Sequence, residues 1–209
     1  MLGKKQYLSD PCGTSSIPYW KALLIPIPSN MKILHHSAFE AGIFDDYMDD
    51  PYFRLMHDLQ ALQSPVLRES YSICTASVAE FAAHINTCYD GVCINEEQLK
   101  GYSLHPVYDA ALWLAVRNNK TGEIVATGIA ELDIDVGEGI LEWIQVSKEH
   151  RRCGLGRFLV LELLWRMKNK AQFVTVSGQY KNPSCPELFY RKCGFTGQDV
   201  WHILQKRDI

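Results

Sequence analysis

Residues 140–166 constrain the possible folds of this chain more than any other stretch. An apolar run ends at Val146, polar and cationic residues follow as far as Arg152, and Gly154 and Gly156 open a mainly apolar segment without proline. This order predicts a strand, a basic turn and a helix. Glycines let a backbone approach a ligand closely, and the free N–H groups at a helix start attract anions. The turn is therefore a candidate anion-binding site.

Three arginines stand beside these glycines, namely Arg151, Arg152 and Arg157. Guanidinium groups suit phosphate oxygens, so the turn could hold two phosphates. A P-loop would require Gly-Lys-Ser or Gly-Lys-Thr, and a dinucleotide fingerprint would require three spaced glycines early in a βαβ unit. Neither pattern occurs here. An ATP-dependent enzyme is disfavoured because no pairing of a lysine with Mg²⁺ ligands is evident.

The turn resembles the Arg/Gln-x-x-Gly-x-Gly/Ala signature of the GNAT N-acetyltransferase superfamily, with Arg151, Gly154 and Gly156 at the fixed positions. In that family the turn holds the pyrophosphate of acetyl-coenzyme A. Two glycines at this spacing are common by chance, so the surrounding sequence must support the resemblance.

The family typically continues with a strand, an asparagine, a short helix and a Tyr-x-x-x-Gly-Phe sequence. This chain has an apolar run at 173–177, then Asn182, and then Tyr190-Arg-Lys-Cys-Gly194-Phe195. It departs from the pattern in one respect, because the spacing from Asn182 to Tyr190 is one residue longer than usual and two prolines intervene. The resemblance covers approximately residues 70–205.

The resemblance implies an α/β fold: a GNAT acyl-CoA N-acyltransferase fold with a mixed, mostly antiparallel sheet, splayed central strands and flanking helices. The patterns of the chain agree with that order of elements. Helices are expected to start at the capping residues Ser77, Asn95 and Ser184 and after Gly154. The resemblance implies that the two helices after Ser77 and Asn95, with their connection, line the acceptor groove. The expected strands are residues 71–75, 112–117, 123–133, 140–146, 173–177 and 195–204.

Residues 1–65 lie outside the resemblance, and we expect them to extend a GNAT acetyltransferase domain at 66–209. Apolar runs at 22–27 and 31–35 predict a hairpin. Asp50-Pro51 is a typical helix start, and the residues after it predict an amphipathic helix that ends at Ser64-Pro65. Its apolar positions are Tyr52, Leu55, Met56, Leu59 and Leu62. Such a stripe would pack on the catalytic domain or on a second subunit, so a homodimer is compatible with the sequence.

Composition narrows the class of protein. The chain has 47% hydrophobic and 22% charged residues, which are ordinary values for a globular protein. Its formal net charge of −3 argues against a nucleic-acid-binding protein, because affinity for DNA rests on many basic contacts. The 7 cysteines and 7 histidines show no zinc-binding spacing. Without an apolar leader or a membrane-spanning run, we expect a cytoplasmic protein that binds no metal, nucleic acid or membrane.

The resemblance implies that acetyl-coenzyme A is the donor. In the family its pantetheine arm lies between the fourth and fifth strands, where unpaired backbone groups bind it like an additional strand. Here that region comprises residues 144–146 and 174–177, and a backbone N–H near Ile144 would stabilise the oxyanion. The expected cofactor-binding residues are Ile144, Val146, Arg151, Arg152, Cys153, Gly154, Leu155, Gly156, Arg157 and Asn182.

Glu142 is the candidate general base. It stands inside an otherwise apolar strand, and a period of two places it on one face with Ile140 and Ile144. Carboxylates are uncommon on such a face, and burial would raise the pKa of Glu142 toward neutrality. The alternative is a partly exposed acid paired with a neighbouring cation. Asp133 and Glu131 on the preceding strand are the fallback bases.

Tyr190 is the candidate general acid, which would protonate the sulfur of coenzyme A. Gly194 can end the helix in a left-handed conformation, and Tyr190 would then project from a rigid element toward the thioester. The alternative is a packing tyrosine, because the adjacent Phe189 indicates that this helix buries aromatic residues. Cys153 lies near a helix N-terminus and is a candidate nucleophile. Against that role, the family transfers the acetyl group directly.

The favoured interpretation is acetyl transfer from acetyl-coenzyme A to a primary amine by direct attack in a ternary complex. The acceptor could be a small molecule or a peptide, and acidic residues at 45–50 and 131–142 slightly favour a cationic one. His105 could move a proton and His150 could touch phosphate, although a lone histidine is more often structural. The main alternative is a non-catalytic GNAT-like sensor that binds an acyl-coenzyme A and signals through residues 1–65.

Overall fold

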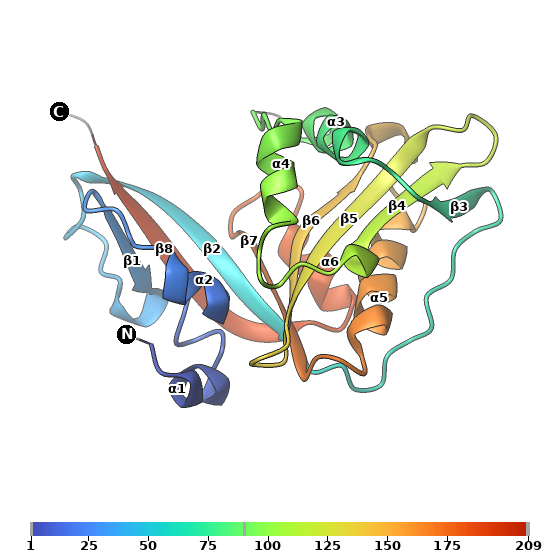
Figure 1. Cartoon of the computed structure of the whole chain (residues 1–209). Helices are drawn as coiled ribbons and strands as arrows, with labels where there is room; N and C mark the ends of the chain where they lie inside the picture. The colour runs from blue at the N-terminus through green and yellow to red at the C-terminus, as the bar shows by residue number, and fades with distance from the viewer. Residues whose placement is uncertain (1, 90, 208–209) are drawn as a thin grey trace. The chain divides into compact units, whose positions relative to one another are not determined.

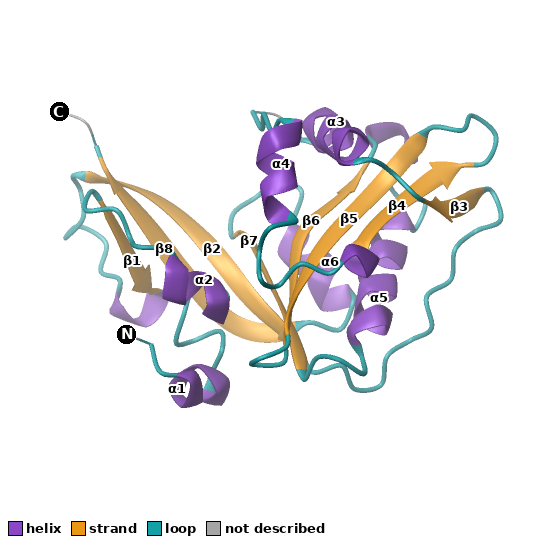
Figure 2. Ribbon diagram, viewed as in Figure 1, coloured by secondary structure: helices purple, strands orange, loops and turns teal. Residues whose placement is uncertain are grey.

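The computed structural model describes residues 2–89 and 91–207. The chain forms two compact units, one of Met1–Asp58 with Thr175–Ile209 and the other of Leu59–Val174. The boundary falls within strand β7 (Phe173–Gln179). Figure 1 labels the elements along the chain, and Figure 2 separates helices from strands. The predicted α/β fold, with a mostly antiparallel sheet and flanking helices, is confirmed.

The unit of residues 59–174 contains antiparallel strands in the order β6-β5-β4-β3. The strands are β3 (Tyr71–Cys74), β4 (Trp113–Asn118), β5 (Ile124–Asp133) and β6 (Glu138–Val146). The helices are α3 (Val78–Cys88), α4 (Glu96–Tyr102) and α5 (Leu155–Met167), with short 3-10 helices η2 (Ala110–Leu112) and η3 (Lys148–His150). Every strand that the sequence predicted in this unit is present.

The two faces of this sheet are covered by different helices (Figure 1). Phe81 of α3 and Leu99 of α4 form a buried cluster with Ile129 of β5. Leu159 of α5 lies next to Gly128 of β5. Because successive residues of a strand face opposite sides of the sheet, Gly128 faces away from the side of Ile129. The buried apolar residues therefore form two layers, with α3 and α4 on one face and α5 on the other.

Reciprocal hydrogen bonds start α3, as the sequence predicted, and also α4, for which the sequence predicted only the start at Asn95. The backbone N–H of Ser77 donates to Glu80 Oε2 at 2.7 Å, and the N–H of Glu80 donates to Ser77 Oγ at 3.2 Å. The bonds that the Ser77 backbone N–H and hydroxyl donate to the Glu80 carboxylate lower the pKa of Glu80. Asn95 and Gln98 exchange the same pair of bonds at 2.9 and 2.7 Å. Each pair satisfies donors that a helix start would otherwise leave open.

The other unit combines both ends of the chain. Its strands β1 (Met31–His35) and β2 (Tyr47–His57) each pair antiparallel with β8 (Thr196–Lys206), and its order is β1-β8-β2-β7. Its helices are α1 (Lys4–Ser9), α2 (Tyr19–Leu24) and α6 (Pro186–Lys192), with a 3-10 helix η1 (His36–Ala38). Within residues 2–89 and 91–207, no helix is long and apolar enough to cross a membrane.

The hairpin predicted for residues 22–27 and 31–35 is wrong. Residues 22–24 belong to α2, and β1 pairs with β8 instead of with the preceding segment. The partner of β1 lies at the far end of the sequence, so a local pattern of two apolar runs could not identify it.

The amphipathic helix predicted from Asp50 is also wrong, because residues 47–57 form strand β2. Phe53, Arg54 and Leu55 are all buried, which hides the alternation of polar and apolar residues that would have indicated a strand. Leu59 has a left-handed backbone with φ of 60°, so no helix continues through it. Pairing with β8 outweighs the helical spacing of the apolar residues.

The start of α6 differs from the expectation in a smaller way. Ser184 does not cap the helix; Cys185 does so in a left-handed conformation with φ of 52°, and Pro186 follows in the first turn. The Ser184 hydroxyl donates instead to Asn182 Oδ1 at 2.6 Å. Gly194, with φ of 101°, follows the helix as predicted.

Candidate active site

The predicted anion-binding turn connects β6 to α5. Arg152 and Gly154 both adopt left-handed backbone conformations, with φ of 61° and 88°. Gly154 is the N-cap of α5, and no side chain caps this helix start. A Cβ atom added to Gly154 would meet nothing within 4 Å, so glycine is needed for its backbone conformation and the space beside it is open. Leu155, which is 2% exposed, anchors the first turn of the helix.

The arginines at this turn differ in their contacts. Arg152 is exposed, and Arg157 Nη2 donates to Gln63 Oε1 at 2.5 Å. Arg151 points back toward the sheet: its Nε donates to the carbonyl of Val146 at 3.2 Å and its Nη2 to that of Cys88 at 3.3 Å. The predicted basic residues are therefore gathered at the turn, with Arg151 engaged by backbone carbonyls.

Cys153 and His150 complete this turn and contact Tyr71 of β3. The Tyr71 hydroxyl lies 3.1 Å from His150 Nδ1. Burial raises the pKa of Tyr71, and the neighbouring Cys153, which hydrogen-bonds to it, raises it further. Cys153 is half-buried. Its contact with Tyr71 gives Cys153 a place in the packing of the turn.

The last residues of β6 direct part of their backbone away from β5. In an antiparallel pair, residues alternate between those that bond to the partner strand and those that point away from it. The N–H of Ser147 bonds to the carbonyl of Val125, so Val146 and Ile144 are of the outward-pointing type. The Ile144 carbonyl accepts a 3.1 Å hydrogen bond from the Tyr89 hydroxyl. Both residues therefore present backbone groups at the edge where the sequence predicted a pantetheine arm.

A β-bulge lies at Glu142. Leu141 pairs with Ala130 and Trp143 with Ile129, which leaves Glu142 as the extra residue on β6. Its side chain is half-buried.

This bulge overturns the predicted period of two around Glu142. Ile140 pairs with Glu131 and shares the face of α3 and α4. Ile144, beyond the bulge, pairs with Gly128 and contacts the side of α5. Ile140 and Ile144 therefore lie on opposite faces, because one extra residue shifts the alternation of side chains.

The two fallback acids on β5 have different environments. Glu131 is 2% exposed, and its Oε1 lies 2.7 Å from His105 Nδ1. Asp133 Oδ1 accepts the backbone N–H groups of Asp135 and Val136 at 3.0 and 3.3 Å, so it shapes the turn between β5 and β6. Glu131 is thereby joined to a second titratable side chain.

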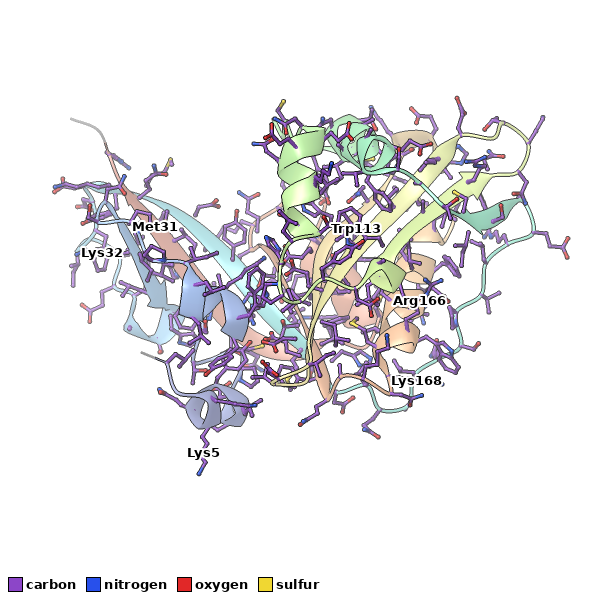
Figure 3. All side chains as sticks on the ribbon, in the orientation of Figure 1. Lys5, Met31, Lys32, Trp113, Arg166 and Lys168 are labelled. Atoms are coloured by element: carbon purple, nitrogen blue, oxygen red, sulfur yellow. The ribbon has the colours of Figure 1, made fainter. Side chains whose placement is uncertain are left out.

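Aromatic residues connect the β6 edge to this pair on the face of α3 and α4. The Tyr89 and Trp143 rings are 5.8 Å apart, and Trp143 Nε1 lies 3.4 Å from the Tyr102 hydroxyl. The Tyr102 ring is 5.0 Å from that of His105. Burial raises the pKa of Tyr89 to about 12, so its hydroxyl stays a hydrogen-bond donor at neutral pH. Trp113, labelled in Figure 3, packs beside Phe81 with ring centroids 5.2 Å apart.

The sequence analysis missed Tyr89 and Tyr102. Their signal was weak: each is an aromatic residue at the end of an expected helix, in the segment that the resemblance assigns to the acceptor.

Tyr190 and Asn182 belong to the unit that contains both chain ends. The Tyr190 ring lies 5.1 Å from Phe189, 5.7 Å from Phe195 and 6.3 Å from Phe53. Asn182 Oδ1 accepts the Ser184 N–H at 2.9 Å and so stabilises the turn before α6. These contacts hold both side chains in place, and their roles toward a cofactor stay predictions.

Among the residues that the structure describes, no group of three His, Cys, Asp or Glu side chains could hold a metal ion.

Comparisons with known proteins agree with this geometry. Residues 109–197 match the family model of the acetyltransferase (GNAT) domain. A search of curated proteins found no match. Among solved structures, a GCN5-related N-acetyltransferase from Sphaerobacter thermophilus is similar, with 18% identity and a TM-score of 0.62 over 77% of this chain. The match spans 52% of that structure, so this chain corresponds to about half of its length.

Two further structures are similar over more of the chain. A putative GNAT acetyltransferase from Novosphingobium aromaticivorans has 12% identity and a TM-score of 0.56, over 88% of this chain and 71% of its own. A conserved protein of unknown function from Staphylococcus epidermidis has 13% identity and a TM-score of 0.62, over 100% of this chain and 82% of its own. At such identities the likeness concerns the fold. Together with the family match over residues 109–197, it shows that this chain has the fold of the GNAT acetyltransferases.

Proposed function

We propose that this protein is an N-acetyltransferase that moves an acetyl group from acetyl-coenzyme A to a primary amine by direct attack in a ternary complex. The observation that carries the proposal is the turn between β6 and α5. It combines two left-handed residues, an uncapped helix start and a cluster of arginines inside the matched domain. This is the arrangement that a pyrophosphate needs.

The residues at the turn fit such a donor. The open space beside Gly154 would admit a phosphate close to the backbone. The proposed contacts are Ile144, Val146, Arg151, Arg152, Cys153, Gly154, Leu155, Gly156, Arg157 and Asn182. Ile144 and Val146 would bind the pantetheine arm through their outward-pointing backbone groups, which accords with the pairing of β6 with β5.

The chemistry requires a base, an oxyanion donor and an acid. Glu142 would accept the proton that the attacking amine loses as the new C–N bond forms. A backbone N–H near Ile144 would stabilise the negative oxygen, and the bulge beside it supports this role because bulges redirect backbone groups. Tyr190 would then protonate the sulfur as the C–S bond breaks.

A second candidate base has direct support from the contacts of β5. The buried Glu131 Oε1 lies 2.7 Å from His105 Nδ1, so the carboxylate could stabilise the imidazolium that forms when His105 accepts a proton. This pair could relay the proton of an amine that binds on the face of α3 and α4. Asp133 accepts backbone hydrogen bonds in the turn between β5 and β6 and is therefore the weaker candidate for the general base.

The remaining proposals concern the whole chain. We place the acetyltransferase domain at residues 66–209, with residues 1–65 as an extension, which accords with a family match at 109–197. The acceptor would be a small-molecule or peptide amine in the cytoplasm. A homodimer is compatible with the chain.

The test is calorimetry with coenzyme A and acetyl-coenzyme A, followed by an assay of thiol release with a panel of primary amines. Binding with amine-dependent release of coenzyme A supports the enzyme. Binding without turnover for any amine would favour the alternative of a non-catalytic acyl-coenzyme A sensor. Absence of binding would contradict both.

A further inference from the structure

The end of α3 lies against the outward edge of β6. Tyr89, the C-cap of α3, is held by its N–H bond to the Ile85 carbonyl at 3.3 Å. Its hydroxyl donates to the Ile144 carbonyl at 3.1 Å, and its ring packs edge-on against Trp143. The hydroxyl therefore takes an acceptor at the position where an added strand would bind.

Arg151 makes a second connection at the same edge. One guanidinium bridges the Val146 carbonyl at 3.2 Å and the Cys88 carbonyl at 3.3 Å, and so joins β6 to the last residue of α3. Ile144 and Val146 are two residues apart, so their carbonyls point to the same side of the strand. Tyr89 and Arg151 thus engage two successive outward carbonyls.

An extended ligand that adds to a strand edge needs these same carbonyls for its amide N–H groups. A carbonyl can accept two hydrogen bonds, but a side-chain donor at hydrogen-bond distance from an outward carbonyl takes up space that an arm along the strand would need. An incoming arm would therefore have to displace the Tyr89 hydroxyl. Arg151 could instead turn from the Val146 carbonyl to a phosphate, since the two positions are a few residues apart in the same turn.

We propose that Tyr89 and Arg151 form a latch that closes the β6 edge and is exchanged for the pantetheine arm and the pyrophosphate when an acyl-coenzyme A binds. This inference rests on the proposed function. It assigns Tyr89 a role in setting cofactor affinity, and it couples cofactor binding to release of the end of α3. Because α3 lies in the segment expected to contact the acceptor, the exchange would open the acceptor side only after the donor arrives.

The latch predicts a gain in affinity when the hydroxyl is removed. Tyr89→Phe keeps the ring against Trp143 and deletes the bond to the Ile144 carbonyl, which stabilises the closed state. The loss of one neutral hydrogen bond corresponds to roughly three- to tenfold tighter binding of coenzyme A. Tyr108→Phe is the matched control, because Tyr108 is 40% exposed and its ring packs beside Trp113 away from these carbonyls.

Calorimetry with two probes separates the latch from the turn. Coenzyme A carries both the arm and the pyrophosphate, whereas ADP carries adenosine and the pyrophosphate without the arm. Tyr89→Phe should bind coenzyme A more tightly than the parent and bind ADP with the parent's affinity, while Tyr108→Phe should match the parent for both. A second readout is hydrogen exchange in the last turn of α3, which should be faster in Tyr89→Phe and in the parent saturated with coenzyme A.

The outcomes are distinct. Equal or weaker binding of coenzyme A by Tyr89→Phe would overturn the latch and leave the proposed function intact. Equal gains for ADP and coenzyme A would also overturn it, because the hydroxyl would then act on the turn and not on the arm. If no variant binds coenzyme A, the proposed function fails and the latch fails with it. Thermal unfolding of Tyr89→Phe close to that of the parent verifies that the fold is retained.

Discussion

The two halves of β6 differ in their surroundings, although they belong to one strand. Before the bulge, Glu138, Ile140 and Leu141 are 0%, 3% and 4% exposed. After it, Trp143, Ile144 and Val146 are all half-buried, and the carbonyls of Ile144 and Val146 accept hydrogen bonds from side chains. The first half is buried, whereas the second half, apart from the buried Gln145, is more exposed. We therefore expect contributions to stability and the proposed cofactor binding to be separated along one strand, with Glu142 at the junction.

Two glycines illustrate the same division. A Cβ atom at Gly139 would lie 2.5 Å from Met167 Sδ and 2.9 Å from Val174 Cγ2, so this glycine is required for close packing. Gly154 has open space and is required for its positive φ. Substitutions at these positions should therefore have different consequences, one for folding and one for binding.

The largest effect that we expect comes from the junction itself. Glu142→Gln removes the proposed base with little change in shape, so kcat should fall by roughly 10²- to 10⁴-fold while coenzyme A affinity stays near the parent's. The acidic limb of the pH–rate profile should also change.

The exposed Glu123→Gln is the control for loss of a carboxylate elsewhere in the unit. An unaltered profile in Glu142→Gln would move the base to the Glu131–His105 pair. The same profile measured in His105→Gln would then lose its acidic limb.

The next largest effect is expected at Tyr190, the proposed general acid, which does not belong to β6. Tyr190→Phe keeps the ring among Phe53, Phe189 and Phe195 and removes only the hydroxyl. We expect kcat to fall by roughly ten- to a thousandfold with unchanged folding. The measurement is turnover with an acceptor for which chemistry is rate-limiting. Parent-like turnover, matched by the control Tyr180→Phe, would show that Tyr190 is a packing residue.

A smaller effect is expected at the turn. Gly154→Val introduces a β-branched side chain at a positive φ and fills the space proposed for phosphate, so coenzyme A should bind at least about tenfold more weakly. Gly122→Val is a matched control because Gly122 also has a positive φ, of 77°, and nothing within 4 Å of an added Cβ. Both variants should lose similar stability. If both bind coenzyme A like the parent, the turn is not its site.

Gly139→Ala should show the opposite behaviour. Its added methyl group would be forced against Met167 and Val174, which should lower the free energy of unfolding by about 1–3 kcal/mol. Coenzyme A affinity of the folded protein should be unchanged. Denaturant unfolding and calorimetry measure the two quantities. Unchanged stability together with weaker binding would contradict the separation of the two halves of β6.

Local signals explain what the sequence could predict. The helix starts at Ser77 and Asn95 follow from bonds within four successive residues, and the left-handed Gly154 follows from the residue type that such a conformation favours. The strands at 140–146 and 173–177 were recognisable because each is a mainly apolar run. Each prediction needed only neighbouring residues.

The features that escaped prediction depend on partners that are distant in sequence. The bulge at Glu142 is defined only by the register of β6 with β5, and β2 exists because β8 pairs with it. The Glu131–His105 pair spans 26 positions and the Tyr89 contact with Ile144 spans 55. No periodicity in the sequence encodes such contacts, so the acceptor side of the site required the structure.

The smallest expected effect concerns His84 of α3, whose side chain contacts the residue that directly follows β6. It is 6% exposed, with Nδ1 2.9 Å from Thr127 Oγ1 and Nε2 2.9 Å from Ser147 Oγ. Burial lowers the pKa of His84 from its ordinary 6.5, and a bond to the Val125 backbone opposes this only in part. The folded state therefore binds fewer protons than the unfolded state below pH 6.5. The contribution of neutral His84 is complete above that pH and is lost as the pH falls through the folded-state pKa, with a slope of at most about 1.4 kcal/mol per pH unit.

The free energy of unfolding should consequently decline less between pH 6.5 and pH 4.5 in His84→Gln than in the parent. His57, whose pKa burial also lowers, gives the control His57→Gln, because its effect should add to that of His84. Parallel stability curves for the parent and His84→Gln would show that His84 is not a neutral support of this half of the strand.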